Sequence, residues 1–222
     1  MPSPPPAAAE PSELIEALRQ ADSPMGLLLA TRRLAEACHP GAAPSLVEVL
    51  GFNNPGAAVA AVDGLIALGE QAVEPLLDNL DGHNYGARAW AVRALAGIGD
   101  VRGLELLESA LACDIGPSVR RAAARGLGQL RLNALPLDQQ ASVRQRCLDA
   151  LLAGGGDGEW VVRYAVAVAL EHLLLSIDRA QPGHHSGLRA LQQLAAETGE
   201  DTPVVRLRSE LALARLAGQT EH

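Results

Sequence analysis

Five aromatic side chains and a few charged ones are the residues of this chain best suited to chemistry. The aromatic residues all lie at or just before the starts of three similar segments, and they are Phe52, Tyr85, Trp90, Trp160 and Tyr164. Aromatic rings stack on other flat groups, and the planar guanidinium of arginine binds a carboxylate through two parallel hydrogen bonds. Trp90 and Tyr164 have a second interpretation, as residues that fill gaps between packed helices. For Tyr85 and Trp160 we favour a surface that binds a ligand or a partner.

Arginines recur at one place in four of the similar segments, namely at Arg88, Arg120, Arg163 and Arg206, and the first segment has Ala58 at this place. A repeated arginine of this kind usually bonds an acidic residue or a carbonyl of the adjacent repeat, so we predict a structural role for this column. Arg93, Arg121 and Arg125 lie outside it and are better candidates for holding a carboxylate ligand. Asp63 occupies the place that Arg93 and Arg125 occupy in later segments. It can accept hydrogen bonds from protonated ligand nitrogens or form a bridge to Arg93, and the sequence leaves both open.

Histidine and cysteine add little to this set. His83 is the only imidazole in the distinctive loops and can transfer a proton near neutral pH, although a lone loop histidine is more often simply solvated. His184 and His185 lie in a segment rich in Gly and Pro without other ligand types, so we predict no metal site. The cysteines are far apart and form no metal-binding spacing, which favours reduced, partly buried thiols at Cys38, Cys113 and Cys147.

Composition excludes several classes of function. The formal net charge is −8, and every basic residue is an arginine. An acidic chain without lysine is a poor binder of nucleic acid and cannot use Schiff-base or P-loop chemistry. No apolar run approaches the roughly 20 residues of a membrane span. Residues 1–11 form a Pro/Ala-rich segment without the features of a signal peptide, so we expect a disordered tail and a cytoplasmic protein.

The elements that position these side chains follow from an internal repeat. Hydrophobic residues make up 48% of the chain but aromatic ones only 2%, so Ala-rich faces must approach one another closely, which suits stacked helices. The pattern Val-Arg-x-x-Ala-x-x-Ala-Leu-x-x-Leu recurs, in steps of three and four residues, in Pro55–Gly69, Tyr85–Gly99, Pro117–Arg131, Trp160–Leu174 and Pro203–Ala217. Residues 12–218 are therefore predicted to be all-α, a curved α-solenoid of about five to six HEAT-like helical hairpins.

Further helices are expected between the repeated segments. The amphipathic stretches are Ser12–Ala21, Met25–Ala37, Ala43–Leu50, Gln71–Leu80, Val101–Ala112, Leu137–Leu152 and Leu188–Glu197. The repeats are about 30 residues apart early in the chain and about 43 later. We expect the extra residues to lie in the loops Gly154–Gly158 and Gln181–Gly187, where Gly, Pro and polar residues gather.

Two stretches are more specific than the general repeat. These stretches are Phe52-Asn-Asn-Pro-Gly-Ala-Ala-Val-Ala-Ala-Val-Asp-Gly-Leu-Ile66 and Asp81-Gly-His-Asn-Tyr-Gly-Ala-Arg-Ala-Trp-Ala-Val-Arg-Ala-Leu95. With Ser118–Leu127 they resemble the F subunit of the heterodimeric E/F-type phycobilin lyases, over residues 40–135 most clearly. The resemblance implies attachment of phycocyanobilin, as a substrate rather than a permanent cofactor, to a cysteine of the phycocyanin alpha subunit, together with an E-type partner. Isomerising relatives carry a His-Cys pair in a short loop; His83-Asn84-Tyr85-Gly86 has no Cys, so we expect attachment without isomerisation.

The resemblance also gives the candidate residues their roles. The thiolate belongs to the acceptor protein, so the lyase has to hold the pigment in one conformation and present it. Residues implied to bind the bilin are Asp63, Trp90, Arg93, Arg121, Arg125, Trp160 and Tyr164, and the candidates for proton transfer are His83 and Tyr85. Cys113 is either a transient thioether carrier or a buried spectator. The alternative functions are a non-enzymatic HEAT-like adaptor and a bilin chaperone in phycobilisome assembly or turnover.

Overall fold

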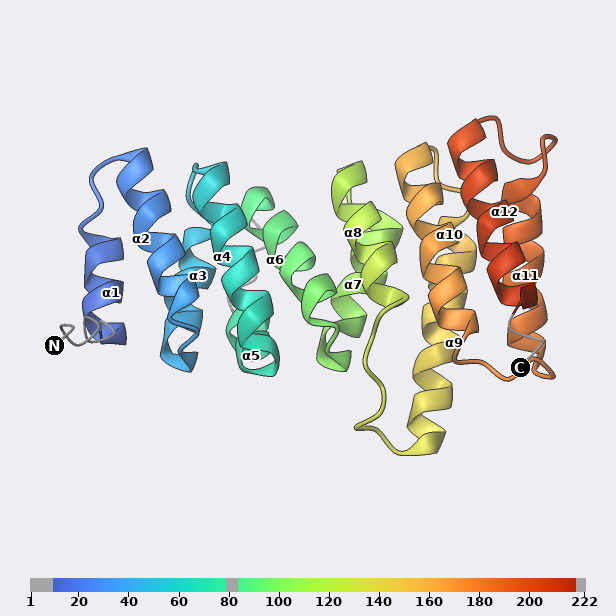
Figure 1. Ribbon diagram of the computed structural model, residues 1–222, viewed down its shortest axis with the longest axis horizontal. Helices are drawn as coiled ribbons and strands as arrows, with labels where there is room; N and C mark the ends of the chain where they lie inside the picture. Colours follow the sequence, from blue (N-terminus) through green and yellow to red (C-terminus); the bar gives the residue numbers. More distant parts are fainter. Residues whose placement is uncertain (1–9, 79–83, 219–222) are drawn as a thin grey trace, which may run out of the picture. The chain divides into compact units, whose positions relative to one another are not determined.

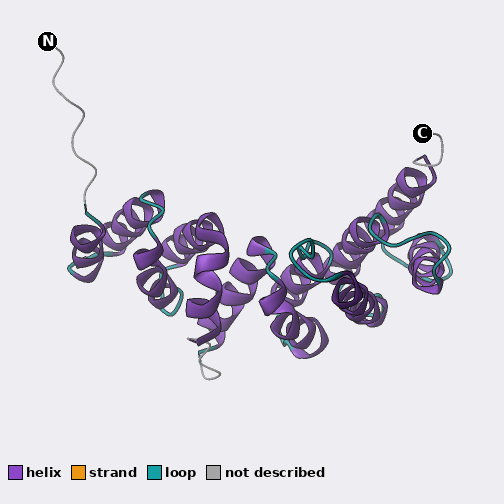
Figure 2. Cartoon of the chain, turned by 90° about the horizontal axis from the view of Figure 1, so that it is seen from below, coloured by secondary structure: helices purple, strands orange, loops and turns teal. Residues whose placement is uncertain are grey.

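The computed structural model describes residues 10–78 and 84–218, and all its regular elements are helices (Figure 1). The chain divides into two compact units, Met1–Ile98 and Gly99–His222. Loops connect the helices of each unit where the chain is described (Figure 2). We call a helix with the repeated pattern a motif helix. Within each unit, motif helices of successive pairs pack on one another. The prediction of an all-α solenoid of helical hairpins is therefore confirmed.

The first unit contains three helices in a row. They are α2 (Pro24–Glu36), α4 (Pro55–Leu68) and α6 (Tyr85–Ile98), with α4 lying between the other two. Of these, α4 and α6 are motif helices, and α2 occupies the equivalent place in the first helical pair. The helices that pack beside them are α1 (Pro11–Arg19), α3 (Ala43–Val49) and α5 (Val73–Asp78), and two short 3₁₀ turns, η1 (Pro40–Ala42) and η2 (Gly69–Ala72), lead into α3 and α5.

The second unit repeats this layout with longer pairs. Its motif helices are α8 (Pro117–Leu127), α10 (Trp160–Leu174) and α12 (Pro203–Gly218), with α10 in the middle. The second row consists of α7 (Leu104–Cys113), which follows η3 (Val101–Gly103), then α9 (Leu137–Gly154) and α11 (Pro182–Ala195).

Small residues allow neighbouring helices to approach closely, as the composition indicated. A Cβ atom added to Gly64 would lie 2.6 Å from the Cβ of Ala35, and one added to Gly128 would lie 2.6 Å from the Cα of Ala169. Atoms at such distances overlap, so only glycine fits at these helix crossings. This explains a core built from Ala, Gly, Val and Leu with few aromatic residues.

Asparagines cap the starts of α4 and α6 in the first unit. The Oδ1 of Asn54 accepts a hydrogen bond from the Ala57 amide at 3.1 Å, and the Oδ1 of Asn84 accepts one from Ala87 at 3.0 Å. The Nδ2 of Asn54 also donates to the Pro24 carbonyl at 2.9 Å, which ties the start of α4 to the start of α2.

Arginines connect the motif helices of the second unit. Arg120 donates to the Asp114 carbonyl at 2.8 Å and to the Asp157 carboxylate at 2.7 Å. One repeat later, Arg163 donates to the Asp157 carbonyl at 2.8 Å and to the Glu200 carboxylate at 2.5 Å. These bonds lower the pKa values of both carboxyl groups, that of Glu200 to about 2.

The other two arginines of the column make fewer hydrogen bonds among the described residues. Arg206 donates to the Glu200 carbonyl at 2.9 Å. The Nε of Arg88 is buried and makes no hydrogen bond within the described residues.

The expectation that the extra residues of the later repeats lie in two loops was wrong. The segment Gln181–Gly187 is not a loop, because α11 already begins at Pro182, whose fixed φ suits a first helical turn. Gly187 instead allows α11 to pack closely on α10, since a Cβ added there would lie 2.6 Å from the side chain of Leu174.

Between the starts of α8 and α10 the extra length lies in α9, which has 18 residues against 10 in α7, and in the segment 128–136. The segment 128–136 begins where α8 ends, at Leu127. Within this segment the Arg131 amide donates a hydrogen bond to the Gly99 carbonyl at 2.8 Å. Between the starts of α10 and α12 the extra length lies in α11, which has 14 residues, and in the segments 175–181 and 196–202 on either side of α11.

One segment of the described chain, Pro55–Asp78, is long and apolar enough to cross a membrane by composition alone. Its most apolar window is 56% buried inside the structure. The segment is also not one straight helix, because α4 stops at Leu68 and Gly69 has a φ of 62°. Its apolar residues are therefore those of a core helix.

Candidate functional site

The motif helices share a set of exposed side chains that we call the motif row. It consists of the residues one and five positions after the repeated arginine place, and it comprises Val59, Asp63, Ala89, Arg93, Arg121, Arg125, Tyr164, Val168, Leu207 and Leu211. All ten are exposed or half-exposed. Residues four apart lie on the same face of a helix, so each helix contributes two neighbouring side chains to the row.

The first unit brings together an acidic, a basic and an aromatic residue of the predicted site. Asp63 on α4 and Arg93 on α6 are exposed, and these two helices pack side by side. The guanidinium of Arg93 lies 5.5 Å from the ring centre of the half-buried Trp90, a cation–π contact. No ion pair joins Asp63 to Arg93 within residues 10–78 and 84–98, so the carboxylate is available to a ligand.

Asp63 lines a groove between α2 and α4 whose volume is about 240 Å³. Arg32 and Glu36 of α2 form its other wall, and Val59 and Gly56 lie beside Asp63. Arg32 and Asp63 have opposite charges but form no ion pair in the described part of the unit. The groove thus presents one guanidinium group, that of Arg32, and the two carboxylates of Glu36 and Asp63 to the same space.

Sequence reasoning missed Arg32, although a signal for it was present. Arg32 follows Pro24 at the distance at which Asp63 follows Pro55 and Arg93 follows Tyr85. Extending the repeat alignment to the first helical pair would therefore have placed Arg32 in the motif row.

The second unit carries the remaining predicted binding residues. Arg121 and Arg125 are exposed on α8, and Tyr164 is half-exposed on the neighbouring α10. Trp160, the first residue of α10, is 46% exposed. On α12 the same row is aliphatic, because Leu207 and Leu211 are 64% and 44% exposed. The row in this unit therefore changes from cationic through aromatic to aliphatic over three helices.

Of the two candidates for proton transfer, the structure describes Tyr85. Tyr85 is the first residue of α6 and is 44% exposed. His83 lies outside the described residues. Cys113 is exposed, so the view of it as a buried spectator is wrong, and the buried thiol is that of Cys147. Within the described ranges no three His, Cys, Asp or Glu side chains converge as metal ligands would.

Comparisons with known proteins give this surface its context. A family model of HEAT repeats matches residues 11–96 and 73–141. The chain is 54% identical to the phycocyanin alpha phycocyanobilin lyase CpcF of Synechocystis sp., over 74% of this chain and 77% of that protein. It is 53% identical to the phycocyanobilin lyase subunit beta of Pseudanabaena tenuis, over 77% of this chain but only 61% of the longer relative. The chain belongs to the F-subunit family of phycobilin lyases.

A solved structure of this lyase family has the same fold. The complex of CpcE and CpcF of phycocyanin lyase from Nostoc sp. PCC7120 contains a chain that superposes with a TM-score of 0.70 at 42% identity. The superposition covers 78% of this chain and 99% of the Nostoc chain. The motif row therefore belongs to a lyase subunit of a kind that forms a complex.

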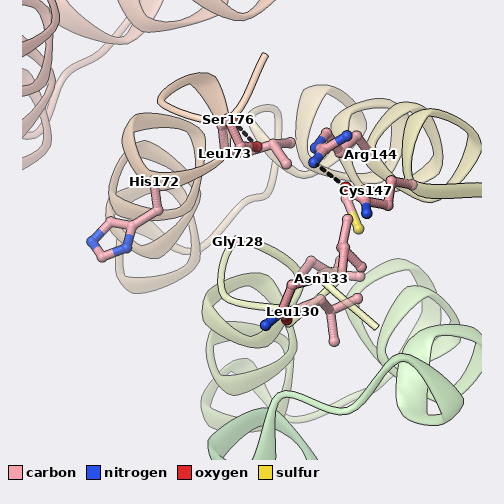
Figure 3. Close-up of a pocket in the computed structure, with 11 residues that line it drawn as sticks. Gly128, Leu130, Asn133, Arg144, Cys147, His172, Leu173 and Ser176 are labelled. Atoms are coloured by element: carbon pink, nitrogen blue, oxygen red, sulfur yellow. Dashed lines mark hydrogen bonds between the residues drawn. The ribbon is translucent and has the colours of Figure 1, made fainter. Parts of the chain in front are cut away.

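The second unit of this lyase subunit also contains a cavity that sequence reasoning missed (Figure 3). It has a volume of about 270 Å³ and lies between the carboxyl ends of α8 and α10 and the first half of α9. Polar residues on its lining include Asn133, Gln140, Arg144 and Ser176, and Cys147 contributes a thiol. No local motif marks these residues, because three helices and a loop bring them together.

Proposed function

We propose that this chain is one subunit of a bilin lyase that acts with an E-type partner. The enzyme attaches phycocyanobilin through a thioether bond to a cysteine of the phycocyanin alpha subunit, in the cytoplasm. The observation that carries the proposal is the 54% identity to a phycocyanin alpha phycocyanobilin lyase, supported by the fold shared with one chain of the CpcE–CpcF complex of a phycocyanin lyase.

In this reaction the subunit positions the reactants, and the acceptor protein supplies the nucleophile. The sulfur of the acceptor cysteine bonds to the exocyclic ethylidene carbon of the pigment, and the thiol proton ends on the pigment. No group leaves and no oxidant is consumed. Holding two reactants in a productive geometry can lower a barrier by as much as about 7–11 kcal/mol.

Each unit by itself carries motif-row residues that suit a flat pigment with carboxylates and protonated nitrogens. Asp63 accepts hydrogen bonds from the pyrrole nitrogens, and Arg93, held by Trp90, binds a propionate. Arg121 and Arg125 offer further guanidinium groups, while Trp160 and Tyr164 offer rings for stacking. His83 and Tyr85 are our candidates for the proton transfer.

The proposal is tested by co-producing the chain with an E-type subunit, a bilin-synthesis pathway and the apo-phycocyanin alpha subunit. A covalent coloured band on the alpha subunit is expected only when both lyase subunits are present. An adaptor would give no band with any partner, and a chaperone would bind the bilin without forming the thioether. Either outcome refutes the lyase.

Variants of the α2–α4 groove locate the site. Asp63→Asn and Arg32→Gln should each slow attachment by roughly tenfold, because each removes a charge-assisted hydrogen bond to the pigment. Arg33→Gln is the matched control, since this exposed neighbour on the same helix lines a different groove, beside α1. Equal effects of Arg32→Gln and Arg33→Gln would show that net charge matters rather than the groove.

A further inference from the structure

The cavity of the second unit has a cationic lining without a counter-charge. Arg144 is its only Arg, Lys, Asp or Glu side chain. The Nη2 of Arg144 donates to the Oε1 of Gln140 at 2.8 Å, but its Nε is buried and has no hydrogen-bond partner in the described chain. A buried guanidinium nitrogen without an acceptor is costly, so this atom points to an acceptor that comes from a ligand.

The other polar groups on the lining do not neutralise this charge. Burial raises the pKa of the Cys147 thiol to about 12, so the thiol stays protonated near neutral pH. The Oγ of Ser176 donates to the Leu173 carbonyl at 2.8 Å, and the Nε2 of Gln140 donates to the Leu135 carbonyl at 2.8 Å. A carboxylate is the group that matches the free Nε and the positive charge of Arg144.

The cavity adjoins α10, the helix that carries Tyr164 and Val168 of the motif row. Its rim includes the exposed His172, which follows Tyr164 and Val168 at four-residue steps on the same face of α10. Eight residues of α-helix span about 12 Å, which places the rim within reach of a molecule lying against Tyr164. At about 270 Å³ the cavity is smaller than sites that enclose a whole drug-sized ligand, about 300–1,000 Å³, so it suits a side group.

We infer that this cavity binds a carboxylate group, with Arg144 as its anchor. This inference rests on the proposed function, according to which the carboxylate is one propionate of the bilin. Arg144 is then a further pigment-binding residue, on a helix outside the repeated motif.

The test measures binding of phycocyanobilin and of its dimethyl ester to the complex of this chain with an E-type subunit, by absorbance titration. Arg144→Gln should weaken binding of the free acid by about tenfold and leave binding of the ester unchanged, because the ester has no carboxylate to lose. Arg146→Gln is the matched control. Arg146 lies on the same helix but is exposed and pairs with Glu108 on α7.

Each outcome has one meaning. If Arg144→Gln changes the affinity for the free acid by less than twofold, or weakens the ester equally, the inference is wrong. If the wild-type complex binds neither pigment and attaches none, the proposed function fails and the inference fails with it. Should Arg144→Gln not fold, Arg144→Lys replaces it. This variant keeps the charge but loses the planar fork, so binding of the acid should weaken several-fold and binding of the ester should not.

Discussion

The carboxylate of Glu200 should contribute more to stability than any other single charge that we describe. Its side chain is fully buried and accepts hydrogen bonds from the Nε of Arg163 at 2.5 Å, the Nη2 of Arg163 at 2.7 Å and the Thr202 amide at 2.9 Å. These bonds, above all those from Arg163, lower the pKa of Glu200 from 4.5 to about 2. Because one pKa unit corresponds to about 1.4 kcal/mol, the ionised form adds about 3 kcal/mol to the free energy of unfolding at pH 7.

The pH dependence of this contribution has a definite sign. The pKa is lower in the folded chain than in the unfolded chain, so the stabilisation is complete above pH 4.5 and is lost as the pH falls toward 2. We therefore expect Glu200→Gln to cost about 3 kcal/mol at pH 7 and only about 1.5 kcal/mol at pH 3. Urea unfolding of the full chain, followed by far-ultraviolet circular dichroism at both pH values, measures the two differences.

The neighbouring carboxylate supplies the control. Asp201 is 92% exposed and lies 3.3 Å from the same guanidinium, so Asp201→Asn should cost less than about 0.5 kcal/mol. A cost of Glu200→Gln below about 1 kcal/mol at pH 7, or one that stays constant between pH 7 and pH 3, would refute the reasoning.

Three further predictions concern packing, thiol reactivity and the pigment site. Gly128→Ala should lower the free energy of unfolding by about 1–3 kcal/mol in thermal or urea unfolding, while Gly158→Ala, which has no atom within 4 Å of the added Cβ, should not. In a thiol-reagent assay at pH 8 two cysteines should react quickly and Cys147 slowly, because burial raises its pKa to about 12; three equally fast thiols would contradict this. Trp90→Ala should reduce pigment attachment several-fold at unchanged helicity, and unaltered attachment would remove Trp90 from the site.

The pattern of the motif helices could be predicted because it is local. Steps of three and four residues between Ala and Leu positions determine a helix face wherever the segment lies, and Pro55, Pro117 and Pro203 mark helix starts in any context. The exposed positions of Asp63 and Arg93 follow from the same periodicity. The specific Asn- and Trp-containing stretches added the family resemblance.

Only the tertiary structure decided which side chains meet. Arg163 pairs with Glu200, which lies 37 residues later in the sequence. This pairing depends on the path of the loop before α12, which brings Glu200 close to α10. Arg32 comes to face Asp63 because α2 packs beside α4, and the Nε of Arg144 has no acceptor in the described chain because α8, α9 and α10 close around it. Burial and charge pairing depend on neighbours that are remote in the chain, whereas a helix depends on residues three and four positions away. The sequence by itself therefore determined the solenoid and its exposed row, and the stacking of the helices decided the groove and the cavity.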